Sequence, residues 1–133
     1  MSSPEKNLAL LMILAGPTGT GKTTLCDGMA AKYSGIQRVI TCTTRRPRDG
    51  EVNGVDYFFL SQEEFDMKVS KDAFLEHAQV FGNFYGTSQA WVEQTLATGT
   101  DVILEIDWQG AEQIRKQIDC CSIFILPPSL QAL

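Results

Sequence analysis

The chain has 133 residues, of which 44% are hydrophobic and 20% charged, a composition typical of one soluble globular domain with its own core. Its formal net charge of −5 argues against a general nucleic-acid binder, because such proteins are usually basic. The four cysteines form no C-x-x-C pair and there is one histidine, so zinc spacing is absent and we expect reduced thiols and a cytoplasmic location. The apolar run at residues 8–15 is too short to span a bilayer, and no small-residue cleavage site follows it, so we expect neither a membrane segment nor a signal peptide.

The first third of the chain predicts a strand, a glycine-rich loop, a helix and a second strand. Residues 8–15 form a continuous apolar run bounded by glycine, which is typical of a buried parallel strand. A helix is expected over residues 22–33, and the β-branched, alternating stretch IQRVITCT, residues 36–43, predicts one strand. The segment that follows contains proline, asparagine and two glycines, which predicts turns.

The middle of the chain, roughly residues 42–88, is more mixed and is expected to form a small lobe. VDYFFL predicts a short strand, and the spacing of Ser61 and Glu64 matches a capping box that starts a helix. The stretch AFLEHAQVFGNFYGT predicts two short antiparallel strands that turn at Gly82-Asn83.

The last third returns to regular alternation of helix and strand. A helix is expected from Ser88 to about Thr98, followed by the buried strand DVILEID, the helix WQGAEQIRKQ and the strand CSIFIL. Alternation at both ends of the chain predicts an α/β fold with a parallel sheet, right-handed crossovers and flanking helices. We expect a single domain whose core comprises residues 8–41 and 89–133, with a mixed α+β lobe at about 42–88.

The glycine loop, residues 16–23, matches the pattern G-x-x-x-x-G-K-[ST] between a predicted strand and a predicted helix. Its backbone N–H groups and the positive end of the helix suit one anion, Lys22 can bridge the β- and γ-phosphates, and the Thr23 hydroxyl can bind Mg²⁺. The alternative is a glycine-rich turn with an exposed lysine. We predict a P-loop NTPase-like sheet that binds a nucleoside triphosphate. The residues predicted to bind it are Gly16, Pro17, Thr18, Gly19, Thr20, Gly21, Lys22, Thr23 and Thr24.

The strand DVILEID ends in two acids that belong beside such a loop. Glu105 and Asp107 are two residues apart, so they point to the same side of a strand. A carboxylate at this position can lie beside Mg²⁺, although many strands end in acids. Glu105, together with Thr23, is therefore the predicted metal-binding pair.

The sequence TTRRPRDGE, residues 43–51, is called the arginine turn here. It places Arg45, Arg46 and Arg48 within four residues, and guanidinium groups bind phosphate oxygens in pairs. The alternative is a solvated charged surface. Because the chain is acidic overall and collects these arginines in one turn, the pattern favours an anion site separate from the glycine loop.

The motifs GPTGTGKTT, TTRRPRDGEVNGVDYFF, FLEHAQVFGNFYGTS and VILEIDWQGAEQIRK, in this order and spacing, resemble guanylate kinase. The resemblance extends from about residue 9 to the end of the chain. It implies phosphorylation of GMP to GDP by ATP with Mg²⁺, by alignment and charge neutralisation without a covalent intermediate. The implied partner is the small molecule GMP, with no nucleic acid and no membrane.

The resemblance also implies roles for individual residues. Lys22, Arg45 and Arg48 would be catalytic, with the two arginines holding the GMP phosphate, and Glu76 would accept the guanine N1–H and N2–H. The alternative for Glu76 alone is an exposed strand carboxylate. The implied substrate-binding residues are Thr41, Arg45, Arg48, Glu51, Tyr57, Glu76, Tyr85, Thr87 and Asp107.

The chain departs from the family pattern at two places. Glu105 stands where the family usually has aspartate, and the chain stops at PPSLQAL, where the family continues through an arginine-bearing lid and a C-terminal half. Arginines of that kind contribute about 10³ to 10⁵ in rate, so we expect a poorly active, self-associating truncated form. The alternatives are a truncated inactive guanylate kinase that binds nucleotide or a partner, and a guanylate-kinase-like protein-binding module. The complete glycine loop argues against the module.

Overall fold

The computed structural model describes residues 9–15 and 22–124, without the side chains of residues 22, 23 and 124. Residues 16–21 of the predicted glycine loop lie outside the described residues. The chain divides into two compact units, which are described separately. Unit 1 comprises Met1–Arg38 and Glu93–Leu133, and unit 2 comprises Val39–Val92.

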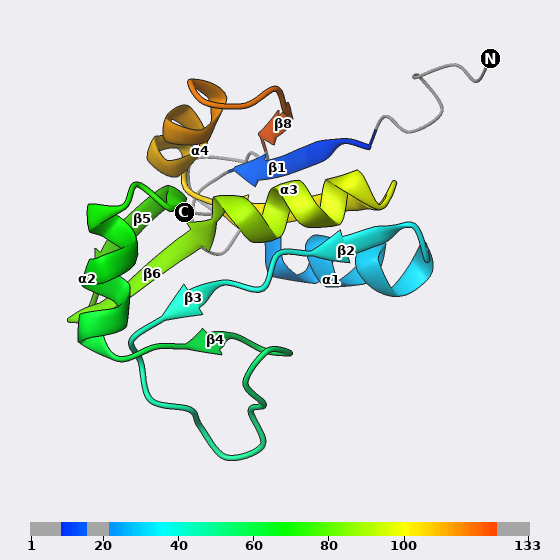
Figure 1. Ribbon diagram of the computed structural model, residues 1–133. Helices are drawn as coiled ribbons and strands as arrows, with labels where there is room; N and C mark the ends of the chain where they lie inside the picture. Colours follow the sequence, from blue (N-terminus) through cyan, green and yellow to red (C-terminus); the bar gives the residue numbers. More distant parts are fainter. Residues whose placement is uncertain (1–8, 16–21, 125–133) are drawn as a thin grey trace, which may run out of the picture. The chain divides into compact units, whose positions relative to one another are not determined.

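The helices and strands of the described residues follow in this order (Figure 1): β1 (Leu11–Ala15), α1 (Lys22–Lys32), β2 (Ile36–Arg38), β3 (Cys42–Thr43), β4 (Phe58–Phe59), α2 (Gln62–Ser70), β5 (Phe74–Val80), β6 (Asn83–Ser88), α3 (Gln89–Ala97), β7 (Asp101–Ile106), α4 (Trp108–Arg115) and β8 (Cys121–Phe124). None of these helices has the length and apolar character needed to cross a membrane.

Unit 1 is built on a parallel sheet whose described strands have the order β2-β7-β1-β8. The two central strands, β1 and β7, pair over their whole described length, from Leu11 opposite Val102 to Ala15 opposite Ile106. Both are nearly continuous apolar runs because parallel strands are covered on both faces. The prediction of a parallel sheet with flanking helices is confirmed.

The two faces of this sheet have separate cores. Leu14 and Ile103 pack with Cys26 of α1 on one face. Neighbouring residues on each strand point the other way, so Ile13 and Leu104, both buried, belong to the opposite face. Because Glu105 is two residues after Ile103, its side chain lies on the α1 face at the carboxyl end of β7.

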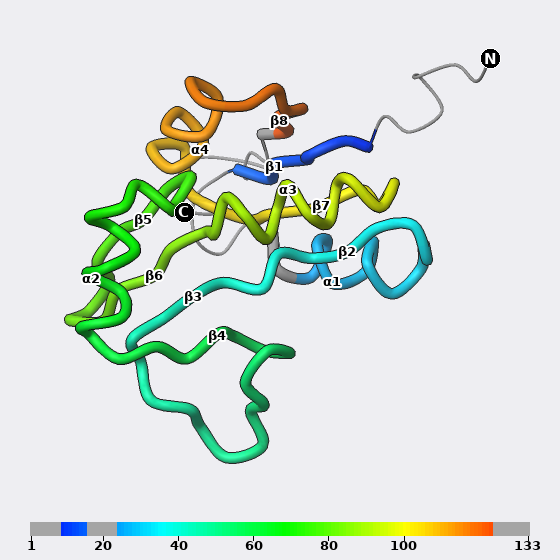
Figure 2. The backbone as a smooth tube through the Cα atoms, in the orientation of Figure 1, coloured from blue at the N-terminus to red at the C-terminus, as the bar shows by residue number. Residues whose placement is uncertain are grey.

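Unit 2 is one continuous segment of backbone (Figure 2) that forms a smaller mixed sheet with the order β4-β3-β6-β5. β3 runs parallel to β4 and antiparallel to β6. Its core contains Cys42, Phe65 of α2 and Phe74 of β5, and the rings of the two phenylalanines lie 4.7 Å apart. The capping box predicted for α2 is present, since Ser61 and Glu64 exchange side chain-to-backbone hydrogen bonds.

Two predicted elements differ in the structure. The single strand expected over residues 36–43 is wrong: β2 ends at Arg38 and pairs in unit 1, whereas β3 starts at Cys42 and pairs in unit 2. The chain passes from one unit to the other between them, so one strand cannot serve both sheets. The hairpin turns at Phe81-Gly82 rather than Gly82-Asn83, because a two-residue turn of this kind needs two positive φ angles, here 50° and 83°.

Candidate functional site

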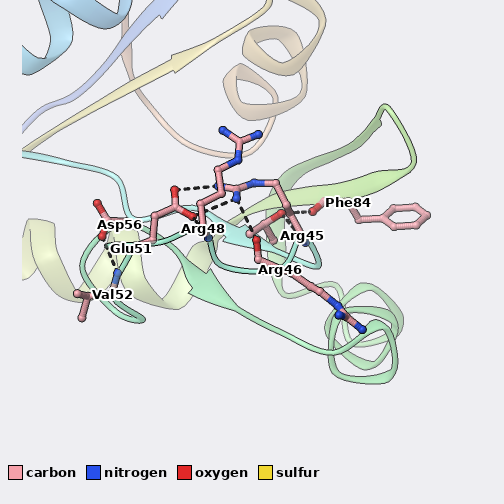
Figure 3. Close-up of polar contacts among 8 residues, drawn as sticks. Arg45, Arg46, Arg48, Glu51, Val52, Asp56 and Phe84 are labelled. Atoms are coloured by element: carbon pink, nitrogen blue, oxygen red, sulfur yellow. Dashed lines mark hydrogen bonds and ion pairs between the residues drawn. The ribbon is translucent and has the colours of Figure 1, made fainter.

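The arginine turn of unit 2 holds its own ion pair (Figure 3). Arg45 donates from Nη1 and Nη2 to the two carboxylate oxygens of Glu51, each at 3.0 Å. Glu51 also accepts the backbone N–H of Arg48 at 2.7 Å. A guanidinium and a carboxylate that meet through two parallel bonds have a fixed orientation, so the position of Arg45 is defined in the absence of a ligand.

Two threonines join this turn to β6. The Thr43 hydroxyl donates to the Phe84 carbonyl at 2.9 Å and accepts the Arg45 N–H at 3.1 Å. The Thr44 hydroxyl accepts the Phe84 N–H at 3.0 Å. Thr43 is fully buried, so the base of the turn is fixed where Arg45 begins.

Aromatic rings lie beside the same arginine. The guanidinium carbon of Arg45 is 4.9 Å from the centre of the Tyr57 ring, and the rings of Tyr57 and Tyr85 are 6.4 Å apart. Contact of a guanidinium with an aromatic face is favourable and restricts its orientation. The structure therefore brings Arg45, Glu51, Tyr57 and Tyr85 together, whereas Arg46 and Arg48 are exposed.

Arg45 and Glu51 each stabilise the charged form of the other. Hydrogen bonding to Glu51, the largest cause, raises the pKa of Arg45 above its ordinary value. Hydrogen bonding from Arg45 and from the Arg48 backbone lowers the pKa of the Glu51 carboxyl. Both groups are thus charged at neutral pH, and Arg45 carries the positive charge that a phosphate needs.

A second polar pair lies further along β6. Thr87, which is fully buried, donates from its hydroxyl to the Glu76 carboxylate at 2.9 Å, and Glu76 is only 8% exposed. Tyr85 and Thr87 are two residues apart on one strand, so they point to the same face of the sheet. The exposed carboxylate considered as the alternative for Glu76 does not fit this burial.

A β-bulge explains why Glu76 faces Thr87. Phe74 pairs with Ser88 but Glu76 pairs with Thr87, so β5 contains one extra residue, Leu75. In a regular strand Phe74 and Glu76 would point to the same face. The bulge directs Phe74 into the core with α2 and Glu76 to the other face.

Unit 1 presents a different charged cluster at the carboxyl ends of its strands. Arg38, the last residue of β2, donates to Asp27 of α1 at 2.5 Å and also to Glu105 of β7. Asp107 is the N-cap of α4, and its carboxylate accepts the Gly110 N–H at 2.7 Å. Ligands of open parallel sheets bind at this edge, which is where the sequence predicted the donor site.

The Glu105 carboxylate is a poor match for a direct Mg²⁺ ligand in this arrangement. Its partner Arg38 is a cation, which would repel a second cation at the same oxygen. Within the described ranges, no group of three histidine, cysteine or acidic residues is placed to hold a metal ion. The side chain of Thr23, the other predicted ligand, lies outside the described part of the chain.

Comparison with known proteins identifies the pattern. The family model described as Guanylate kinase matches residues 9–133. The chain belongs to the guanylate kinase family. It is 59% identical over 124 residues to guanylate kinase of Hahella chejuensis and 47% identical over 131 residues to that of Symbiobacterium thermophilum. These alignments cover 92% and 98% of this chain, and 60% and 62% of the relatives.

A solved guanylate kinase confirms the fold. The crystal structure of the enzyme from Anaplasma phagocytophilum matches with a TM-score of 0.70 at 35% identity, over 96% of this chain and 64% of that chain. The chain spans about 60% of the length of the curated guanylate kinases it matches. The resemblance to guanylate kinase drawn from the motifs is thus confirmed.

Sequence reasoning missed Arg38. Its partners Asp27 and Glu105 are 11 and 67 residues away in the chain. The available signal was a single arginine in a β-branched stretch near the carboxyl end of a predicted parallel strand. Because the sequence predicts one strand up to residue 43, it gives no sign that a strand ends at Arg38.

Proposed function

We propose that this protein takes part in the transfer of a phosphoryl group from ATP to GMP, giving ADP and GDP. The observation that carries the proposal is the buried Glu76–Thr87 pair on the same strand face as Tyr85, with Tyr57 beside that tyrosine and Arg45 against the Tyr57 ring. A carboxylate and a guanidinium in one small unit complement the two ends of a nucleoside monophosphate. The named relatives, all guanylate kinases, support the same substrate.

The part of the proposed site that meets the base selects guanine through the hydrogen-bond donors of guanine. Guanine presents N1–H and N2–H side by side, and an ionised carboxylate only accepts hydrogen bonds. Adenine has an acceptor at N1, which would face the same carboxylate unfavourably. The hydroxyls of Thr41 and Thr87 are proposed to assist at the base, and Thr87 already fixes the Glu76 carboxylate.

The part of the proposed site that meets the GMP phosphate neutralises the negative charge of that phosphate. Arg45, Arg48, Tyr57 and Tyr85 are proposed to hold the GMP phosphate, and Arg45 is oriented in advance by its partners. Orientation of this kind reduces the entropy lost when the reacting groups align. Asp107, the N-cap of α4, is proposed to act near the guanine amino group and the phosphates.

The site for ATP, the phosphoryl donor, is proposed from the glycine-loop motif. Lys22 and Thr23 start α1, directly after the glycine loop, where a helix N-terminus favours phosphate. Mg²⁺, which would stabilise the charge of the ATP phosphates, is proposed to bind through Thr23, because Glu105 is held by Arg38. Free cysteines at positions 26, 42, 120 and 121 are in keeping with action in the reducing cytoplasm.

The proposal is tested by calorimetric titration of the purified chain with GMP, AMP and guanosine, and by a coupled assay of ADP release. We expect GMP to bind more tightly than both other ligands, and ADP release to require GMP. Lys22→Ala should abolish transfer while GMP binding stays nearly unchanged. Equal affinities for GMP and AMP would contradict the guanine assignment. ADP release at the same rate with and without GMP would contradict the assignment of GMP as the phosphoryl acceptor.

A further inference from the structure

We propose that Glu51 is a positioning residue for the phosphate-binding arginine and does not itself contact the substrate. The inference rests on the proposed function, since it assigns Arg45 to the GMP phosphate. It replaces the substrate-binding role that the family resemblance implied for Glu51. The observation that motivates it is the network of three hydrogen bonds on this one carboxylate (Figure 3).

The geometry fixes both arginines of the turn from one group. The Oε1 and Oε2 atoms of Glu51 accept hydrogen bonds from the two terminal nitrogens of Arg45, and Oε1 also accepts one from the backbone N–H of Arg48. One carboxylate thus sets the orientation of the first guanidinium and the course of the backbone at the second arginine. The side chains of Arg45 and Glu51 are only 12% and 21% exposed, so solvent competes weakly for these bonds.

The chemistry excludes a direct contact between Glu51 and a phosphate. Both groups are anionic at neutral pH, and an ionised carboxylate has no proton to donate. The guanidinium between them can serve both, because it carries five N–H donors. Glu51 and the Arg46 carbonyl engage three of these donors, which leaves others able to meet phosphate oxygens.

Two explanations of Glu51 predict opposite changes in phosphate affinity when its negative charge is removed. If Glu51 were only a nearby anion, its neutralisation would relieve repulsion and tighten phosphate binding. If Glu51 orients Arg45, its loss frees a long, flexible side chain and weakens binding. Loss of one charged hydrogen bond between Arg45 and the phosphate would weaken binding by about 10- to 150-fold.

The decisive experiment compares Glu51→Gln with Asp56→Asn by titration with GMP and with guanosine. Asp56→Asn is a matched control because Asp56 lies in the same segment and the substitution removes the same charge. Among the described residues, the hydrogen bond found for the Asp56 carboxylate is one that it accepts from the Val52 N–H at 2.7 Å. We expect Glu51→Gln to weaken GMP binding by about 10- to 100-fold, the scale of one lost charged hydrogen bond, and leave guanosine binding unchanged. Asp56→Asn should leave GMP binding equal or slightly tighter. Unchanged or tighter GMP binding in Glu51→Gln would overturn the inference.

A second measurement needs no ligand. In the wild-type chain, the guanidinium ¹H–¹⁵N signals of Arg45 should be protected from solvent exchange because Glu51 holds them. They should lose this protection in Glu51→Gln and keep it in Asp56→Asn. Equal protection in all three chains would refute the positioning role. If the wild-type chain instead binds no GMP while this pattern is seen, the proposed function fails and the positioning of Arg45 stands.

Discussion

The carboxylate of Glu76 is the residue on which base selection depends in the proposed function. It is 8% exposed and accepts the Thr87 hydroxyl at 2.9 Å. Glu76→Gln keeps the size of the side chain but places an N–H₂ donor opposite the guanine donors. Loss of a charged hydrogen bond costs roughly 1.5 to 3 kcal/mol, so titration should show GMP affinity reduced about 10- to 150-fold.

AMP binding should not decrease in this variant, because adenine lacks the paired donors. Glu112→Gln is the control, since Glu112 is a carboxylate on α4 of unit 1 that pairs with Arg115. It removes the same charge and should leave the ratio of GMP to AMP affinity unchanged. A Glu76→Gln chain with the wild-type ratio would disprove base selection by this residue.

Gly86 separates the two site residues of β6 and has a steric requirement of its own. A Cβ atom at this position would lie 2.8 Å from Cδ1 and 2.9 Å from Cε1 of Phe74. Since Phe74 is buried and packs against Phe65, the ring has little room to move. Gly86→Ala should therefore lower the free energy of unfolding by about 1–3 kcal/mol in urea denaturation.

Two further variants separate overpacking from a general effect of alanine. Phe74→Leu in the Gly86→Ala background should recover part of the loss, because the smaller side chain leaves space for the methyl group. Gly28→Ala should instead stabilise by about 0.5–1 kcal/mol, since Gly28 is in helix α1 and, apart from its chain neighbours and the backbone of the helix itself, no atom lies within 4 Å of the point that an alanine methyl group would occupy. Equal effects of Gly86→Ala and Gly28→Ala would contradict the steric argument.

Among the elements, helix α2 is stabilised by a titratable capping group. The Glu64 carboxylate accepts the Ser61 N–H at 2.8 Å, and this bond lowers the pKa of Glu64 below its ordinary value. A lowered folded-state pKa contributes stability at pH values above the unfolded pKa, and this contribution is lost as pH falls through the folded pKa. Urea denaturation from pH 7 to pH 3 should therefore show that Glu64→Gln is less stable than wild type at neutral pH.

The difference between the two chains should shrink on acidification below about pH 4.3, where an unperturbed glutamate is half protonated. Glu63→Gln is the matched control, because Glu63 is the preceding residue in the same first turn but is not the capping partner. Its difference from wild type should be smaller at neutral pH. A gap between Glu64→Gln and wild type that is constant over the whole pH range would contradict a role for the charged form.

Local elements were predictable, and features that depend on distant partners were not. The capping box could be predicted because Ser61 and Glu64 are three residues apart and need no other part of the chain. The glycine-rich and arginine-rich motifs are likewise local. The bulge at Leu75 depends on how β5 pairs with β6, and the Arg38 cluster depends on partners as distant as Glu105, so neither leaves a local pattern.

At the scale of the whole molecule, each unit has a buried thiol that can report on its unfolding. Cys26 belongs to the core of unit 1 and Cys42 to that of unit 2, and both are less than 4% exposed. Burial, the largest cause, raises the pKa of Cys26 to about 11 and also raises that of Cys42. At pH 8 a thiol of pKa 11 has roughly 200-fold less thiolate than an ordinary cysteine of pKa about 8.5.

Timed alkylation followed by mass spectrometry should therefore modify the exposed Cys121 first in the folded chain. Cys26 and Cys42 should react only when denaturant opens their cores. Cys26→Ser and Cys42→Ser variants identify which modified peptide belongs to which unit. Rapid native labelling of Cys26 or Cys42 would show that its core is open.

The continuity of unit 2 also has a consequence for inheritance. The residues proposed to contact GMP, apart from Asp107, fall within Val39–Val92, which is one continuous stretch of the chain. A recombination event with one breakpoint on either side of that stretch could exchange acceptor recognition between two family members as a block. The codons for the glycine loop would remain with the recipient. Evolution could thus alter the molecule that receives the phosphoryl group without rebuilding the part that supplies it.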